Sequence, residues 1–369
     1  MKSRNHNKSA SSWAEISPKD WFDWGWQYKN RIQTIIQLAG CFNVTPAKLA
    51  KWGTVAGYYP FCITPYYFSL MNAADENDPI RLQCLPDRKE TNFSPGHLTD
   101  PLEEKRDMPV SGLVHRYPDR CVVIITNICA TYCRHCNRKR MWKSNAMKYN
   151  TGYLRRMIDY ISRTSRIREV IVSGGDPLTM KESTLDWFLG SLRSIPHVEV
   201  LRIGSRIPVV MPMRITRQLC SMLHKYRPLW FNTQFNHPNE ITPEAGRACE
   251  MLLEAGIPVS NQSVLLKGIN DNYETMKDLL YGLQRISVRP YYLFHCDPVK
   301  GTDHFRTDIL SGIHIMEKVW RNVSGLCIPQ YVYDIPGGKG KFPLHPFSLF
   351  PAERLESGEY FFDKTDEVN

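Results

Sequence analysis

The sequence predicts an α/β protein built on a full or partial (β/α) barrel. Six short runs rich in β-branched and aromatic residues recur between residues 121 and 294, and longer amphipathic stretches separate them. The runs are almost continuously apolar, which is typical of parallel strands whose outer face is covered by helices. The chain has 369 residues, of which 42% are hydrophobic, so it is long enough for one barrel with extensions.

Residues 1–108 precede these alternating apolar runs and amphipathic stretches, and they are expected to form a helical N-terminal region. Apolar side chains recur near helical spacing over residues 21–38, and a loop rich in proline and aspartate follows at about residues 77–101. The first residues, MKSRNHNKSASSW, predict a basic tail, with an organellar transit peptide as the alternative. No run approaches the roughly 18 apolar residues of a membrane span, so a cytoplasmic location is expected.

Residues 109–335 are predicted to form the barrel core. Its expected strands are the runs CVVIIT, EVIVSGG, VEVLRIG, LWFNTQF, PVSNQSVLL and PYYLF. Chemistry in such barrels lies on the loops after the strands, and polar residues collect at these points. They lie at residues 127–136, 174–176, 204–206, 236–240 and 295–297. Residues 336–369 are expected to form a lysine-bearing loop and a short C-terminal extension.

Three of the 11 cysteines stand close together after the first run, in the motif CxxxCxxC formed by Cys129, Cys133 and Cys136. Three thiolates at this spacing can hold three corners of a [4Fe–4S] cube and leave the fourth iron open, which is a catalytic feature. A zinc site is the alternative, but it needs a fourth ligand and His135 lies awkwardly between two of the cysteines. The other eight cysteines lack ligand spacing and are expected to be buried core residues.

The charge balance first raises the possibility of nucleic-acid binding. Lys and Arg total 47 against 37 acidic residues, which gives a formal net charge of +10. The basic residues are spread along the chain, apart from the short run of residues 138–140 after the cysteines. Anionic small ligands explain the surplus equally well, so we expect neither a nucleic-acid nor a membrane partner.

Two glycine-bearing segments are further candidates for ligand binding. Ser173, Gly174, Gly175 and Asp176 follow the second run, where two adjacent glycines allow the backbone to approach a ligand closely. Near the C-terminus, YDIPGGKGKFPL follows the strand-like QYVYDI and carries two lysines among three glycines. A lysine amine there could form the Schiff base that pyridoxal phosphate (PLP) needs, and a flexible surface turn is the alternative.

Over about residues 105–345 the chain resembles the lysine 2,3-aminomutases, a family of radical S-adenosylmethionine (SAM) enzymes that also carry PLP. The matching segments are SGLVHRYPDR, TNICATYCRHCNRKR, SGGDPL, RIGSRIPVV, FNTQFNHPNEIT, NQSVLLKGIND, RPYYLFHCDPVKG with HFRT, and PGGKGK. The resemblance implies a partial (β/α) barrel of the radical SAM type, with a [4Fe–4S] cluster, SAM and PLP as cofactors.

The resemblance also implies roles for individual residues. The cluster ligands are Cys129, Cys133 and Cys136, and the SAM-binding residues are His135, Ser173, Gly174, Gly175 and Asp176. The residues expected near PLP are Lys341, which forms the Schiff base, and Arg116, Arg120 and Arg206, which face its phosphate region. The family has a PGGGGK-type motif, and Lys339 here replaces one of its glycines. The expected substrate contacts are Arg138 with the carboxylate, and Asp297 and Asp334 with a distal ammonium group.

The reaction implied by the resemblance is a 2,3-amino migration, in which a 5′-deoxyadenosyl radical removes hydrogen from C3 and nitrogen moves from C2 to C3. L-Lysine is favoured as the substrate because two neighbouring buried carboxylates need a cation between them. Arginine, another amino acid or a protein-bound lysine are the alternatives, and an iron–sulfur protein that binds or modifies nucleic acid is the alternative from another class.

The expected partners are an amino acid and an external one-electron reductant of the flavodoxin or ferredoxin type, and we expect a homo-oligomer. Clostridial-type lysine enzymes have a longer C-terminus with a zinc-binding cysteine cluster, whereas the last cysteine here is Cys327. Assembly supported by zinc is therefore not expected.

Overall fold

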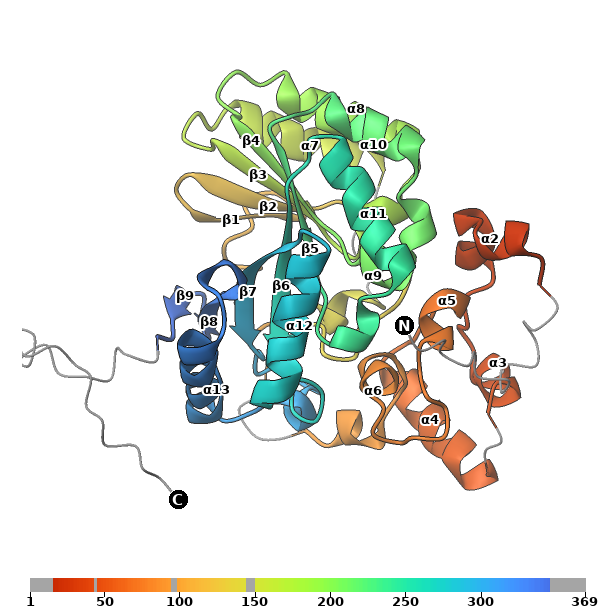
Figure 1. Cartoon of the computed structure of the whole chain (residues 1–369). Helices are drawn as coiled ribbons and strands as arrows, with labels where there is room; N and C mark the ends of the chain where they lie inside the picture. The colour runs from red at the N-terminus through yellow and green to blue at the C-terminus, as the bar shows by residue number, and fades with distance from the viewer. Residues whose placement is uncertain (1–15, 43–44, 94–97, 144–149, 346–369) are drawn as a thin grey trace, which may run out of the picture.

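The computed structural model describes residues 16–42, 45–93, 98–143 and 150–345. Its centre is a curved nine-stranded sheet whose strands follow one another in sequence order (Figure 1). The seven strands β2 to β8 are parallel to one another. At the two edges of the sheet, β1 pairs antiparallel with β2 and β9 pairs antiparallel with β8. The strands are β1 Leu113–Tyr117, β2 Arg120–Ile124, β3 Glu169–Ser173, β4 Val200–Gly204, β5 Leu229–Thr233, β6 Val259–Leu265, β7 Arg289–His295, β8 Gln330–Ile335 and β9 Gly340–Pro343. This confirms the predicted partial (β/α) barrel.

The six predicted runs correspond to β2 through β7, and the strand-like QYVYDI is β8. The sequence did not predict the edge strands β1 and β9. Their sequences, LVHRY and GKFP, are short and carry charged residues, as edge strands commonly do. Both edges form hairpins with their neighbours, so each brings a basic segment back toward the parallel strands.

Helices cover the outer face of the sheet (Figure 1). They are α7 Thr151–Ser162, α8 Glu182–Arg193, α9 Ile207–Val210, α10 Arg217–His224, α11 Pro243–Glu254, α12 Tyr273–Arg285 and α13 Ile309–Asn322. Several of these helices begin at a polar residue whose side chain accepts a hydrogen bond from a free backbone N–H of the first turn. The capping residues of this kind are Asn150, Thr216, Thr242 and Asn272.

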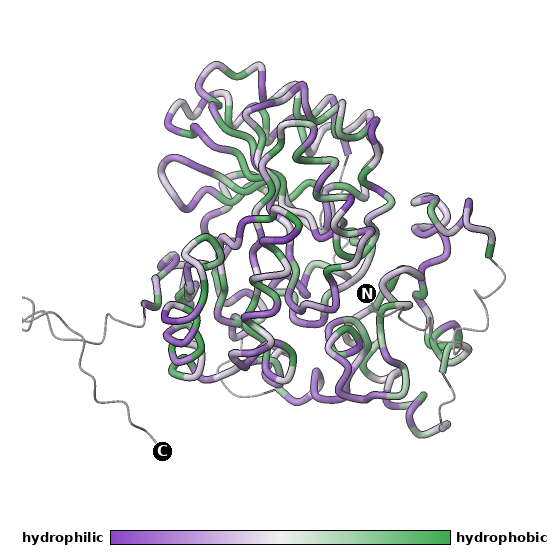
Figure 2. The backbone as a smooth tube through the Cα atoms, viewed as in Figure 1, coloured by the Kyte–Doolittle hydropathy of each residue, from purple (hydrophilic) through white to green (hydrophobic). Residues whose placement is uncertain are grey.

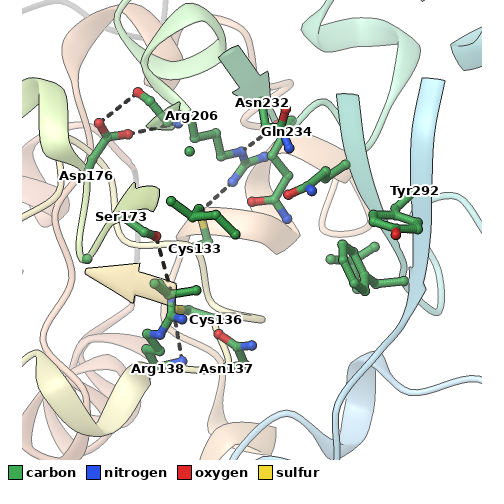
Figure 3. A pocket seen from close by; sticks show the side chains of 18 of the residues that line it. Cys133, Cys136, Asn137, Arg138, Ser173, Asp176, Arg206, Asn232, Gln234 and Tyr292 are labelled. Atoms are coloured by element: carbon green, nitrogen blue, oxygen red, sulfur yellow. Dashed lines mark hydrogen bonds between the residues drawn. The ribbon is translucent and has the colours of Figure 1, made fainter. Parts of the chain in front are cut away.

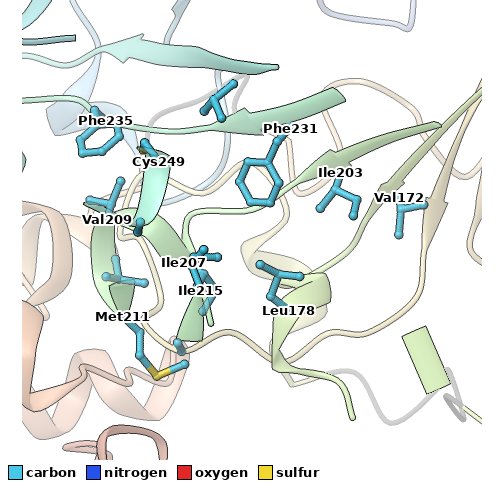
Figure 4. Close-up of a cluster of buried hydrophobic side chains, with 14 of the residues drawn as sticks. Val172, Leu178, Ile203, Ile207, Val209, Met211, Ile215, Phe231, Phe235 and Cys249 are labelled. Carbon is cyan, nitrogen blue, oxygen red and sulfur yellow. The ribbon is translucent and has the colours of Figure 1, made fainter. Parts of the chain in front are cut away.

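The hydrophobic core lies between the sheet and these helices. Val172, Ile203 and Phe231 come from three neighbouring strands, and all are fully buried (Figure 4). Apolar residues follow the strands and the inner helix faces, whereas hydrophilic residues dominate the outer surface (Figure 2). The eight cysteines outside the CxxxCxxC motif are all buried, as predicted.

We refer to residues 16–93 as the N-terminal region. Its elements are α1 Pro18–Trp21, α2 Trp24–Lys29, α3 Ile35–Gly40, α4 Pro46–Tyr58, α5 Pro65–Ser69, α6 Pro79–Cys84 and the short 3₁₀ helix η1 Arg88–Thr91. Helical spacing over residues 21–38 does not produce one helix. Asp23 and Thr34 each cap the start of a new helix, and Ile32 between them pairs with Ile63 in an isolated bridge.

The N-terminal region packs beside the barrel, with α5 against α9 and α6 against the loop after β5. No helix in the described parts of the chain is long and apolar enough to cross a membrane. The predicted boundaries at residues 108 and 335 remain predictions, and residues 346–369 of the expected C-terminal extension lie outside the described residues.

Candidate active site

A cavity of about 620 Å³ lies inside the curve of the sheet and receives residues from β1 through β9. It brings together every residue that the sequence selected for the site. These residues are Arg116, Arg120, Cys129, Cys133, His135, Cys136, Arg138, Ser173, Gly174, Gly175, Asp176, Arg206, Asp297, Asp334 and Lys341. Lys339, the second lysine of the glycine-rich segment, is exposed and does not line the cavity.

One end of the cavity is formed by the loop of residues 129–136, which we call the cysteine loop. Its three cysteines are partly exposed, in contrast to the other eight. Burial and the neighbouring thiols raise the pKa of Cys129 well above its usual value, and burial followed by Cys133 raises the pKa of Cys136 to about 11. Positive charge beside Cys129 and Cys136, such as bound metal ions, would therefore favour their thiolate forms.

The described residues contain no group of three or more His, Cys, Asp or Glu side chains arranged to hold a single metal ion. A single zinc ion needs its ligands to converge on one point, whereas the cysteines of an iron–sulfur cube bind separate corners. The described residues therefore lend no support to the zinc alternative.

Arg206, which the resemblance assigns to the PLP region, lines the cavity and contacts the thiol end. Its Nη1 lies 2.7 Å from Cys133 Sγ (Figure 3). Its Nη2 donates to Glu240 Oε1 at 2.6 Å. Nη2 also contacts Gln83 and Tyr67, and Nε donates to the Gln234 carbonyl. These contacts hold the Arg206 guanidinium at the cavity wall beside Cys133.

His135 is buried beside the second and third cysteines, with its ring edge-on to Phe305. Its Nε2 lies 3.3 Å from the amide nitrogens of both Gln234 and Asn236. The side-chain amide of Asn236 is oriented by Val264, whose backbone N–H donates to Asn236 Oδ1. Burial lowers the pKa of His135 well below its usual value, so the ring is neutral and aromatic at the place where the sequence predicts SAM.

The glycine pair after β3 allows close packing between two loops. Gly174 has φ +142°, and a Cβ at this position would lie 2.3 Å from the Thr126 carbonyl oxygen. A Cβ on Gly175 would lie 2.4 Å from the Ile128 carbonyl oxygen. The carboxylate of Asp176 is turned toward the protein, where it accepts from Ser205 Oγ and the Arg206 N–H (Figure 3). The segment thus anchors the start of the cysteine loop as well as lining the cavity.

Lys341 stands at the other end of the cavity, on β9 and opposite Asp334 on β8. Its Nζ lies 3.3 Å from Asp334 Oδ2, and 5.5 and 5.9 Å from the ring centroids of Phe294 and Tyr117. Its backbone N–H donates to Tyr117 Oη at 3.1 Å. An amine between aromatic faces at a cavity wall fits the attachment point of a planar aldehyde cofactor.

Arg116 and Arg120, at β1 and the start of β2, add positive charge to the wall of the cavity. The Arg120 guanidinium lies 3.9 Å from the centroid of the Tyr117 ring, which is also a neighbour of Lys341. Arg116 is held by Asp107 at 2.6 Å and by the Leu102 carbonyl. Planar guanidinium groups suit phosphate oxygens, so both arginines are placed as phosphate candidates near the amine.

Arg138 projects between the two ends of the cavity. Glu104 accepts from its Nε at 3.0 Å and from its Nη2 at 2.7 Å. Nη1 lies 3.4 Å from Ser173 Oγ (Figure 3). Arg138 and Arg140 together lower the pKa of the buried Glu104 to about 2, in spite of its burial. Glu104 therefore stays ionised and holds the Nε and Nη2 side of the Arg138 guanidinium. The Nη1 side faces the cavity.

Asp297 and Asp334 lie close enough for their charges to interact. Burial raises the pKa of Asp297 to about 7, with a further contribution from Asp334. Compared with the ordinary value of 3.8, this disfavours the ionised form of Asp297 by roughly 4 kcal/mol. Asn137 partly offsets this by donating to Asp297 Oδ2 at 3.0 Å. A cationic guest would relieve the same cost.

Three residues of this site were missed in the sequence: Tyr117, Glu104 and Asn137. Tyr117 and Asn137 lie inside the segments SGLVHRYPDR and TNICATYCRHCNRKR, so their place in matching motifs could have indicated them. Glu104 has no local signal, because its partner Arg138 is 34 residues away in the chain.

The basic run after the cysteine loop is not a surface patch. Arg138 and Arg140 pair with Glu104, and Lys139 pairs with Glu90. Binding of the nucleic-acid backbone needs exposed cations, whereas these three cationic side chains form ion pairs with carboxylates of the protein. The run therefore lends no support to the nucleic-acid alternative.

The chain is similar to several known proteins. A family model described as the Radical SAM superfamily matches residues 123–280. The chain is 46% identical over 340 residues to L-lysine 2,3-aminomutase of Clostridium subterminale, covering 92% of this chain and 82% of that protein. It is 47% identical over 333 residues to the enzyme of the same name from Acetoanaerobium sticklandii, covering 90% and 80%. Glutamate 2,3-aminomutase of Clostridioides difficile is 42% identical over 328 residues, covering 89% and 78%.

Proposed function

Because the chain belongs to the lysine 2,3-aminomutase family of radical SAM enzymes, we propose that it isomerises a free L-α-amino acid, with L-lysine favoured, to the β-amino acid. The observation that carries this proposal is one cavity lined by both the three cysteines and Lys341. When bound, the [4Fe–4S] cluster with SAM would supply a radical able to remove an unactivated hydrogen, and PLP would hold the migrating nitrogen.

In this proposal the residues of the cavity bind the cofactors and orient the substrate. Cys129, Cys133 and Cys136 hold the cluster. The neutral ring of His135 and the backbone of residues 173–175 line the SAM site, with Asp176 shaping that loop. Lys341 is the attachment point for PLP. Arg116, Arg120 and Arg206 face its phosphate region, in keeping with the fit of guanidinium groups to oxyanions.

The substrate is held at its two charged ends. The Nη1 edge of Arg138 binds the α-carboxylate, and Glu104 keeps the guanidinium in place from the other side. Asp297 and Asp334 bind a distal ammonium group, which removes the repulsion between the two carboxylates. The charge of this pair favours lysine over glutamate, while arginine, another cationic amino acid and a protein-bound lysine remain the alternatives.

The partners of the reaction follow from the same proposal. The cluster needs an external one-electron reductant, and a flavodoxin or ferredoxin type is proposed. A homo-oligomer and a cytoplasmic location, both expected from the sequence, are likewise proposals.

The function is tested by anaerobic incubation of the reconstituted enzyme with SAM, PLP, a reductant and a panel containing lysine, arginine, glutamate and alanine. We expect β-lysine, detected by mass-resolved separation of the α- and β-isomers, and little product from glutamate. Efficient turnover of glutamate but not lysine, or β-isomer formation that does not require SAM, would contradict the proposal.

The carboxylate pair predicts how lysine binding depends on pH. The pKa of Asp297 is about 7, so its ionised form is lost as the pH falls through this value, and the attraction for an ammonium group is lost with it. We expect the affinity for lysine to be full above about pH 7 and to fall about tenfold per pH unit below it, as expected for the uptake of one proton. Equilibrium binding of lysine to the PLP-loaded enzyme between pH 5.5 and 8.5 measures this.

Asp297→Asn is the matched control for the pH profile. This variant should bind lysine weakly at every pH and should show no loss of affinity specific to the acidic range. A wild-type profile in the variant would show that another group causes the pH dependence.

A further inference from the structure

The N-terminal region supports the cysteine loop along its backbone. The N–H of Tyr132 donates to the Cys62 carbonyl at 2.9 Å, and the N–H of Arg134 donates to the Gln83 carbonyl at 2.8 Å. The loop has no helix or strand of its own, so these bonds replace the ones that regular structure would provide. They connect residues that lie about 50 to 70 positions apart in the chain.

Side chains of the N-terminal region hold the first half of the same loop. Arg31 Nη1 donates to the Cys129 carbonyl at 2.9 Å. The thiol of Cys62 faces the Ala130 carbonyl at 3.3 Å, and Thr131 Oγ1 accepts from the N–H of Thr64. Contacts with the N-terminal region therefore reach from the first cysteine of the motif to the residue after the second.

Glu90 ties the second half of the loop to the N-terminal region. Its carboxylate accepts from Nε and Nη2 of Arg134, at 2.9 and 2.7 Å, and from Nζ of Lys139, at 2.8 Å. Arg134 lies between Cys133 and Cys136, and Lys139 follows Cys136 by three positions. All three charged side chains are almost completely buried. An uncompensated charge at such a place is strongly unfavourable, so the three groups depend on one another.

The remaining donors of this cluster are also satisfied by protein groups. Arg134 donates to the carbonyls of Pro60 at 2.8 Å and Tyr59 at 3.3 Å, and Lys139 donates to the Gly301 carbonyl at 2.9 Å. Lys139 Nζ lies 4.2 Å from the centre of the Tyr59 ring, whose face attracts the surplus positive charge. The arrangement fixes two points of the chain that flank Cys136.

We propose that Glu90 is a positioning residue for the iron–sulfur cluster and that the N-terminal region is the template that holds the cysteine loop ready for it. A loop without regular structure would otherwise have to be ordered by the cluster itself, which weakens cluster binding. The proposal rests on the proposed function only in taking the three cysteines as cluster ligands.

Glu90→Gln tests the proposal, because one oxygen is replaced by an NH₂ group that faces the donors of Arg134 and Lys139. After anaerobic reconstitution we expect at least tenfold less iron and sulfide per chain, and a reduced cluster with a changed electron paramagnetic resonance spectrum. PLP attachment at Lys341, followed by its visible absorbance, should be unchanged. The backbone N–H groups of Tyr132 and Arg134 should exchange with solvent faster in the cluster-free protein.

Glu76→Gln is the matched control. It makes the same substitution in the same region, but Glu76 is exposed and pairs with Lys48 on the surface. It should keep the iron content, the spectrum and the exchange rates of the wild type.

Glu90→Gln with wild-type iron content and spectrum would overturn the proposal, and so would a loss of PLP attachment equal to the loss of iron, since that indicates general unfolding. If Glu90→Gln does not accumulate as folded protein, Arg31→Met is the second variant, because Arg31 is partly exposed and its bond to the loop is made to the Cys129 carbonyl at the start. We expect it to fold, to bind PLP and to retain severalfold less iron; wild-type iron content in this variant would again overturn the proposal. Wild-type enzyme that takes up a cluster but forms no β-isomer would contradict the proposed function alone.

Discussion

Cys133→Ala is expected to lose both the visible absorbance of the cluster and all formation of β-amino acid, and Cys129→Ala and Cys136→Ala are expected to do the same. A cube held at three corners loses one of its protein ligands in each variant. The two thiols that remain in each variant cannot replace the third ligand, and the other eight cysteines, all of them buried, lie outside the motif. Iron and sulfide per chain, visible absorbance and product formation after anaerobic reconstitution measure the effect.

Cys249→Ala provides the control for these variants. Cys249 is fully buried on α11 among apolar side chains and lies outside the cavity (Figure 4). Its replacement should lower stability slightly and leave the cluster and the activity intact. If any of the three motif variants kept a full cluster and normal turnover, the assignment of the ligands would be wrong.

The sequence predicted the parallel part of the sheet well, because buried strands have a local signal. Each of the six runs is apolar enough to be recognised without knowledge of its neighbours, and each became a strand. The edge strands β1 and β9 have no such signal, since charged residues such as Arg116 and Lys341 interrupt their apolar character. Their pairing depends on hairpins that bring them back to β2 and β8.

The candidate site was predictable where its residues lie in recognisable motifs, and less so where tertiary contacts decide a role. Arg206 is the clearest example. The resemblance assigns it to the PLP region, and no local pattern indicates its contacts with Glu240 and Gln83, which come from other parts of the chain. The glycines at 174 and 175 show a related difference. The sequence explained them by approach to a ligand, whereas the structure adds a packing requirement against Thr126 and Ile128.

Lys341→Ala is expected to abolish covalent PLP binding and with it all amino migration, whereas Lys339→Ala is expected to retain both. The two lysines are two residues apart and both are exposed, but only Lys341 lines the cavity, together with Asp334 and Tyr117. Borohydride reduction of the PLP-loaded protein should leave a pyridoxyl label on the peptide that contains residue 341. Cluster content should be normal in both variants, because the cysteine loop is supported by the N-terminal region and not by β9. A label that disappears only in Lys339→Ala would show that the exposed lysine reaches into the cavity and that the register of β9 against β8 does not select the cofactor-binding amine.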